Sequence, residues 1–172
     1  MSRRAEIIEV ARRLLESRGP GGVTMRAIAG ELGIRAPSLY KHITDKHELE
    51  VALIADGFAE QADAFEVAIT GPSDPVAAIA ATYRAWALEH PHLYRMMTDQ
   101  PLARDELPEG LEDRAAAPLV AALGGDIDRA RAGWAFAHGM VTLELADRFP
   151  PDADLDAPWT VGIDTITKGA QR

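Results

Sequence analysis

The stretch from residue 35 to residue 42 gathers side chains that can contact a nucleic acid. Arginine and lysine hydrogen-bond base edges and neutralise phosphates, and serine and histidine add further hydrogen bonds. Pro37 stands near the start of this stretch, as expected for the first turn of a short helix, where the missing N–H has no intrahelical partner. Such a helix can enter a major groove N-terminus first. It would then present these residues to the DNA: Arg35, Ala36, Ser38, Lys41 and His42.

The residues around this stretch have the spacing of a helix-turn-helix. The apolar positions before it recur at i, i+3, i+4 and i+7, as on one face of a helix: Met25, Ile28, Ala29 and Leu32. Gly33 can adopt the left-handed conformation of a tight turn, and the small Ala29 lets two helices cross closely. The pattern predicts a helix over 24–33 and a second short one over 35–43, with Leu39 and Ile43 facing inward.

Charge is distributed unevenly along the chain, whose 18 Lys/Arg and 27 Asp/Glu give a net charge of -9. Residues 1–47 hold nine basic and five acidic side chains, a net +4, whereas residues 48–172 hold nine and twenty-two, a net -13. A basic head on an acidic body lets one end meet a polyanion while the rest is repelled from it. Ordinary fluctuation of charge would explain the same numbers, so the asymmetry gains its meaning from the motif.

Nearly every segment of the chain has helical periodicity and none shows sustained apolar–polar alternation, which predicts an all-α protein of about nine helices. A helix from about Ser2 to Gly19 precedes the helix-turn-helix, and a long helix capped by Thr44 or Asp45 follows it. This long helix joins a predicted DNA-binding domain, residues 1–47, to a predicted helical regulatory and dimerisation domain, residues 48–172. Proline, glycine and capping residues predict the remaining helices at 74–90, 93–98, an alanine-rich stretch ending at 124, 127–149 and 156–168, with loops at 70–73 and 101–110.

Several classes of function are excluded by composition. The chain has no cysteine, so it has neither disulfides nor a thiolate metal site nor a cysteine nucleophile. It also lacks a nucleophile elbow, a phosphate-binding glycine loop and a metal-spaced His/Glu cluster, and we expect no catalysis, cofactor or metal. No apolar stretch approaches the roughly 18 residues of a membrane span. The charged residues from Arg3 to Arg13 leave no apolar region for a signal peptide, so we expect a cytoplasmic protein without a membrane partner.

The run Val23–Ile43, followed by Lys46, closely resembles the DNA-binding domain of tetracycline-repressor-like (TetR family) regulators. The Leu39-Tyr40-x-His42 step is especially typical. The resemblance implies phosphate contacts from Thr24, Arg26, Tyr40 and Lys46. It also implies base-facing positions at Arg35, Ala36, Pro37, Ser38, Lys41 and His42. Because Arg35 stands where a capping serine is common, and Ala36 offers only a methyl group, no operator sequence is implied.

Residues 83–97 and the Trp134-x-x-x-His138-Gly139 step resemble the WHG type of TetR C-terminal domain. This resemblance implies a homodimer through the last two helices, a palindromic double-stranded operator, and a cavity for an unknown small-molecule effector among the central helices. The candidate lining residues are Tyr83, Trp86, Met96, Met97, Trp134, His138 and Met140. These side chains could equally form core, and His138 or Glu144 could supply a polar anchor in a cavity.

The sequence therefore predicts a sequence-specific DNA-binding transcriptional regulator, a repressor released by a small, largely apolar ligand. Two alternatives belong to other classes of protein. A helical interaction or architectural protein would use the helix-turn-helix only for packing, and an enzyme would need a catalytic set that the motifs do not contain. Neither alternative would bind DNA with sequence selectivity.

Overall fold

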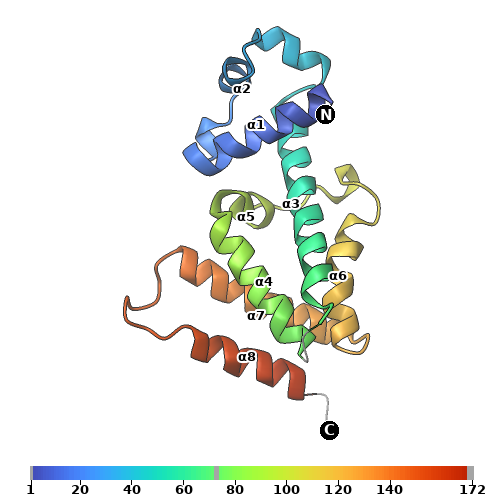
Figure 1. Cartoon of the computed structure of the whole chain (residues 1–172), viewed down its shortest axis with the longest axis vertical. Helices are drawn as coiled ribbons and strands as arrows, with labels where there is room; N and C mark the ends of the chain where they lie inside the picture. Colours follow the sequence, from blue (N-terminus) through green and yellow to red (C-terminus); the bar gives the residue numbers. More distant parts are fainter. Residues whose placement is uncertain (1, 72–73, 170–172) are drawn as a thin grey trace. The chain divides into compact units, whose positions relative to one another are not determined.

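The computed structural model describes residues 2–71 and 74–169, and within these ranges every regular element is a helix (Figure 1). The α-helices are α1 Arg3–Arg18, α2 Met25–Glu31, α3 Lys46–Ala68, α4 Pro75–Glu89, α5 Pro91–Thr98, α6 Leu111–Ala122, α7 Ile127–Leu145 and α8 Asp156–Lys168. Short 3-10 helices occur at η1 Pro20–Gly22, η2 Ala36–Lys41 and η3 Arg104–Glu106. The predicted all-α class is confirmed. Pro72 and Ser73 of the predicted loop at 70–73 lie outside the described residues.

One predicted helix, 127–149, is shorter in the structure, where α7 ends at Leu145. Asp147 has a φ of 51°, a left-handed conformation that an α-helix of L-residues does not continue through. The N–H of Arg148 turns back to donate to the carbonyl of Leu143 at 3.0 Å. The helix has therefore already stopped before Pro150, the residue from which the sequence predicted its end.

The chain divides into two compact units, each described here by itself. Unit 1 comprises Met1–Phe58 and His90–Leu111, and unit 2 comprises Ala59–Glu89 and Glu112–Arg172. Residues 1–47 lie wholly in unit 1, which also contains α5 and the segment after it. The predicted division into 1–47 and 48–172 is a division by function, and it stays a prediction.

The core of unit 1 is formed by α1, α2, η2, the first half of α3, and α5. Ser2 caps α1 by accepting a hydrogen bond from the N–H of Ala5 at 3.2 Å, and Gly19 ends the helix with a φ of 68°. Fully buried side chains come from every one of these elements: Ile7, Leu15, Ile28, Leu39, Ile43, Leu49, Leu53 and Leu93. Burying such side chains stabilises the unit by about 1.5–3 kcal/mol each before the entropy of ordering is counted. The helix-turn-helix thus rests on a continuous apolar core.

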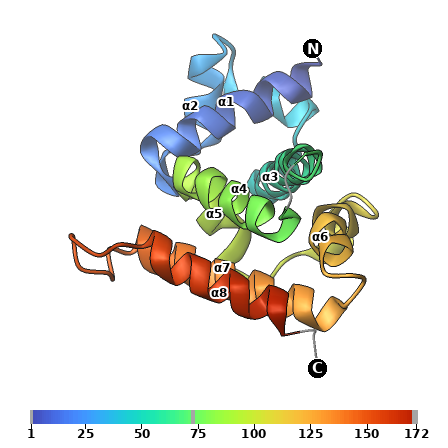
Figure 2. The ribbon, with the colours of Figure 1, turned by 60° about the horizontal axis from the view of Figure 1, so that its bottom comes forward.

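In unit 2, α7 and α8 run side by side (Figure 2). The small Gly133 of α7 lets α8 lie close to it, and a Cβ placed on Gly133 would lie 3.6 Å from Ile166 of α8. The guanidinium of Arg129 on α7 donates to the carbonyls of Ile166 and Thr167, the latter at 2.8 Å, and so satisfies the last turn of α8. In the described part of the chain, none of the helices has the length and apolar character that crossing a membrane requires.

Candidate nucleic-acid interface

The turn between α2 and η2 is fixed by backbone hydrogen bonds. Thr24 caps the start of α2 by accepting from the N–H of Ala27 at 3.1 Å. At the other end, the N–H of Ile34 donates to the carbonyl of Ala29 at 2.9 Å, and the N–H of Gly33 donates to the carbonyl of Gly30 at 3.2 Å. These two bonds, with Gly33 at a φ of 65°, form a Schellman motif. The motif sets the direction in which the chain enters η2.

The second helix of the motif is a 3-10 helix, six residues long. Its hydrogen bonds join residues three apart, from the N–H of Ser38 to the carbonyl of Arg35 and from the N–H of His42 to the carbonyl of Leu39, both at 2.8 Å. Leu39 and Ile43 are fully buried beneath it, as predicted. Because Leu39 anchors the helix from below, the residues around it face outward.

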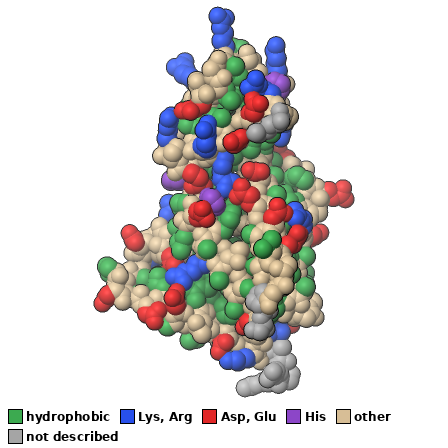
Figure 3. Space-filling model, in the orientation of Figure 1, with side chains coloured by type: hydrophobic (Ala, Val, Ile, Leu, Met, Phe, Trp, Pro, Cys, Tyr) green, Lys and Arg blue, Asp and Glu red, His purple; other side chains and the backbone are tan. Residues whose placement is uncertain are grey.

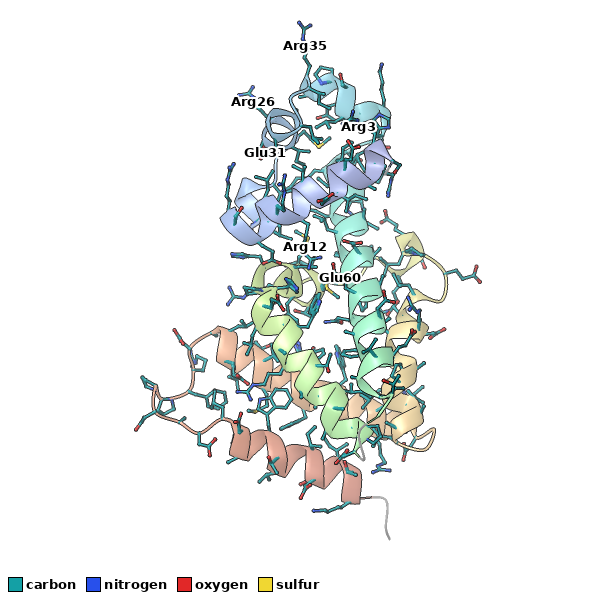
Figure 4. The ribbon with its side chains drawn as sticks, viewed as in Figure 1. Arg3, Arg12, Arg26, Glu31, Arg35 and Glu60 are labelled. Carbon is teal, nitrogen blue, oxygen red and sulfur yellow. The ribbon has the colours of Figure 1, made fainter. Side chains whose placement is uncertain are left out.

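Most of the predicted DNA-contacting residues are exposed on unit 1. Lys and Arg side chains project from the end of this unit that carries α2 and η2 (Figure 3), and Arg26 and Arg35 point away from the helices (Figure 4). Tyr40 is 54% exposed, a high value for a large aromatic side chain. The other exposed members are Thr24, Pro37, Lys41, His42 and Lys46, while Ala36 and Ser38 are half-buried. Their contacts with DNA stay predictions.

Lys46 is the first residue of α3, and its ammonium lies 3.2 Å from the carboxylate of Glu50. Both side chains are substantially exposed, so the pair contributes little to stability. A phosphate would have to compete with Glu50 for this ammonium. The N-terminal position is unfavourable for a cation in the helix dipole, which a bound phosphate would offset.

Asp45, one of the two caps that the sequence predicts, begins α3, and sequence reasoning missed the two residues that support this cap, Glu48 and Arg4. Asp45 accepts from the N–H of Glu48 at 2.8 Å, and the carboxylate of Glu48 accepts from the N–H of Thr44 at 2.6 Å. The Thr44 hydrogen bond, helped by Arg4 at 3.2 Å, lowers the pKa of Glu48 below its ordinary value. The Asp45-x-x-Glu48 spacing is that of a capping box, a sequence signal that could have revealed this arrangement. Arg4 therefore braces the head of α3 next to Lys46.

The predicted effector-lining residues do not form one cluster within either unit. Met96 and Met97 belong to unit 1, where Met97 packs so closely on Gly57 that a Cβ there would lie 2.6 Å from its sulfur. The others belong to unit 2. Tyr83, Trp86, Met97 and Met140 are buried, Met96 and His138 are half-buried, and Trp134 is 53% exposed.

Two of the aromatic members have neighbours that bear on their roles. The indole N–H of Trp86 donates to the carboxylate of Glu60 at 3.3 Å. Trp134 instead stacks on His138, with ring centroids 5.7 Å apart. Glu144, weighed as a polar anchor, has its carboxylate engaged by Arg84 and Trp159. Over the described ranges, no group of three or more His, Asp or Glu side chains is arranged to hold a metal ion.

The comparisons with known proteins agree with this geometry. Residues 7–53 match the family described as bacterial regulatory proteins, tetR family, and residues 76–166 match the tetracyclin repressor-like C-terminal domain. The chain is 31% identical to Mycobacterium tuberculosis Rv0681, named an uncharacterized HTH-type transcriptional regulator, over 98% of this chain and 82% of that protein. It is 29% identical to the HTH-type transcriptional regulator Mb1846 of Mycobacterium bovis over 88% of this chain, which covers only 65% of that protein's length. A solved structure of a Rhodococcus sp. RHA1 protein of unknown function superposes with a TM-score of 0.79, at 25% identity, over 98% of this chain and 95% of the other.

The fold and the exposed helix-turn-helix define a class of helical DNA-binding regulators. Since the C-terminal match alone spans more than half of the chain, this chain belongs to the TetR family of bacterial regulatory proteins. The family is one of regulators rather than of enzymes.

Proposed function

We propose that the chain is a sequence-specific DNA-binding transcriptional regulator that reads its operator with η2. The observation that carries the proposal is the outward face of η2, where Arg35, Tyr40, Lys41 and His42 are exposed while Leu39 is fully buried beneath them. A short helix of this composition on a fixed turn can reach base edges and phosphates. Residues 1–47 would bind DNA and residues 48–172 would regulate that binding.

A homodimer formed through α7 and α8 would bring two such helices to one operator. Large apolar side chains on these helices are exposed, as expected of a surface that a second copy covers: Ile127, Trp134, Leu143 and Val161. A two-fold dimer reads a palindromic site with half-sites about one helical turn apart. The acidic remainder of the chain would keep the dimer oriented with its basic ends toward the DNA.

The regulator would act as a repressor in the cytoplasm that a small, largely apolar ligand releases from DNA. Buried Tyr83, Trp86 and Met140 in unit 2 supply the kind of apolar wall that such a ligand requires. The ligand must bind the DNA-competent and the released states unequally, and about 1.4 kcal/mol of difference lowers operator affinity tenfold.

Selection from a pool of random duplexes, followed by fluorescence anisotropy at two salt concentrations, tests the proposal. We expect the protein to enrich a palindromic duplex and to bind it tightly in the presence of competitor DNA. The double variant Tyr40→Ala with Lys41→Ala should bind that duplex at least about tenfold more weakly, because it removes a phosphate contact and a base-edge contact. Glu112→Gln with Asp113→Asn, on exposed or half-buried positions of α6, is the matched control and should bind normally.

Two results would contradict the proposal. Weak binding that salt abolishes equally for every duplex would favour an architectural protein whose helix-turn-helix only packs. Unchanged affinity in the Tyr40/Lys41 variant would exclude η2 as the reading element.

A further inference from the structure

The N-terminus of α5 is capped by a side chain from a different helix. His90, the residue before α5, makes no side-chain capping hydrogen bond, and Pro91 has no N–H to satisfy. The next two amides instead donate to the carboxylate of Glu16 on α1, from His92 at 3.3 Å and from Leu93 at 3.1 Å. A carboxylate at this position satisfies orphan amides and interacts favourably with the helix dipole. Glu16 thereby ties α1 to α5.

The surroundings of Glu16 reinforce this tie. Arg12, one turn earlier on α1, lies 3.8 Å from its carboxylate and 3.9 Å from that of Asp56 on α3. Figure 4 shows Arg12 on the α5 side of α1. The side chains of Arg12 and Glu16 are only 13% and 22% exposed, so solvent screens this pair less than a surface pair.

The end of α1 and the start of α5 also pack closely against each other. Gly19 ends α1 with a φ of 68°, and a Cβ there would lie 3.4 Å from the ring of His92. The last turn of α1 therefore contacts the first turn of α5 through the two hydrogen bonds to Glu16 and through the close approach of Gly19 to the His92 ring. All of these contacts lie within unit 1.

The contact between Glu16 and α5 lies directly after the junction between α4 and α5. α4 ends at Glu89 and α5 begins at Pro91, so a single residue, His90, connects α4 to the first turn of α5, whose amides Glu16 caps. On the other side, α1 packs against α2, the first helix of the helix-turn-helix. Glu16 is thus the polar link between a helix of the regulatory part and the helix that supports the DNA-reading element.

We propose that Glu16 is a positioning residue, which couples the orientation of the helix-turn-helix to the junction between α4 and α5. This inference rests on the function proposed above. Glu16 faces α5, and it is not among the residues predicted to contact DNA. Glu16 should matter for binding a duplex with two half-sites, because the helix-turn-helix of each protomer must then be held at one fixed distance from that of the other. A single half-site needs only one helix-turn-helix, whose position relative to the second protomer does not affect binding.

The test compares four proteins on two duplexes by fluorescence anisotropy. The proteins are wild type, Glu16→Ala, Glu16→Gln and the control Glu9→Gln, which removes the same charge from an exposed position of α1. The duplexes are the one that wild type selects and a version with one half-site scrambled. We expect Glu16→Ala to lose about tenfold in affinity for the full duplex, within the range of allosteric couplings, and to bind the half-site as wild type does. Glu16→Gln, which keeps one acceptor, should lose less, and Glu9→Gln should lose nothing, since removing an acid does not weaken binding to a polyanion.

Hydrogen exchange of the wild-type protein gives a readout that needs no variant. Because coupling is reciprocal, binding of the full duplex should slow exchange of the amides of His92 and Leu93. Unchanged exchange at both amides would overturn the proposal even if a Glu16 variant failed to fold.

Equal losses on the full and half-site duplexes, or no loss on either, would also overturn it. Equal losses would mean that Glu16 only stabilises the fold of the helix-turn-helix and the helices around it. If wild type selected no duplex, the proposed function would fail and the coupling with it. If wild type selected a duplex and the Glu16 variants bound it equally well, the coupling would be refuted while the proposed function would stand.

Discussion

The carboxylate of Glu144 on α7 lies 3.0 Å from the guanidinium of Arg84 on α4, and the Glu144 side chain is only 6% exposed. Its second oxygen accepts from the indole N–H of Trp159 on α8 at 2.7 Å. Arg84 also pairs with Asp156 at 2.7 Å and lies 5.6 Å from the centre of the Trp159 ring. One buried carboxylate therefore joins three helices of unit 2.

Replacing Glu144 by alanine should destabilise the protein by about 2–3 kcal/mol, because it leaves a partly buried guanidinium and an indole N–H without this acceptor. Urea unfolding at one fixed protein concentration measures this as a lower midpoint. Arg131→Ala, which breaks the exposed pair with Asp128, is the control and should cost less than about 0.5 kcal/mol. Similar midpoints for the two variants would refute the structural role of Glu144.

Two glycines of the helix-turn-helix should respond in opposite directions to alanine. Gly33 has a φ of 65°, so Gly33→Ala should cost about 1–2 kcal/mol and weaken binding to the selected duplex. Gly30 lies inside α2, and a Cβ there would meet nothing within 4 Å. Gly30→Ala should therefore stabilise the protein by about 0.5–1 kcal/mol. Thermal melts of both variants check the sign, and a stabilised Gly33→Ala protein would rule out the left-handed turn.

Features of the fold that depend on neighbouring residues could be predicted from the sequence. Ser2, Thr24, Asp74 and Asp126 each accept a hydrogen bond from the N–H three residues later, which is the local chemistry of an N-cap. The turn at Gly33 and the burial of Leu39 follow from spacing in the same way. The 3-10 character of η2 did not follow, because a short polar segment with a proline has no pattern that separates the two helix types.

Features that depend on distant residues could not be predicted. Glu16 caps amides 76 and 77 positions away, and Glu144 binds a guanidinium 60 positions away. Each glutamate has an ordinary helical context in the sequence. Trp86 and Trp134 show the same limit for the candidate effector site. Both stand in apolar helices, yet one is 8% exposed and the other 53%. The helical pattern assigns an apolar residue to a face, but tertiary packing decides whether that face is covered.

Gly162 on α8 should be intolerant of even a methyl group. A Cβ there would lie 2.1 Å from the ring of Phe136 on α7, so the ring would have to move. Gly162→Ala should cost about 1–3 kcal/mol and weaken the proposed dimer, because it pushes apart the two helices that form its surface. Gly133→Ala is the control, since its methyl group would make an ordinary contact, 3.6 Å from Ile166. Urea unfolding and sedimentation velocity test both effects, and a Gly162→Ala protein that matches Gly133→Ala in both would disprove the close packing.

The ion pair between His47 and Glu106 should make part of the stability depend on pH. The Nε2 of His47 on α3 lies 2.8 Å from the carboxylate of Glu106 in η3, and this hydrogen bond raises the pKa of His47 above its ordinary value of 6.5. Since the pKa is higher in the folded state, the pair stabilises the protein fully below pH 6.5, and the contribution is lost as the pH rises through the folded-state pKa. Glu106→Gln should therefore lower the melting temperature at pH 5.5 more than at pH 8.5, and should shift the NMR titration of His47 toward lower pH.

Asp105→Asn, the neighbouring acid in η3, removes the same charge without breaking the pair and should leave the His47 titration nearly unchanged. An equal melting difference at both pH values, or an unmoved His47 titration in Glu106→Gln, would show that the pair does not form in solution.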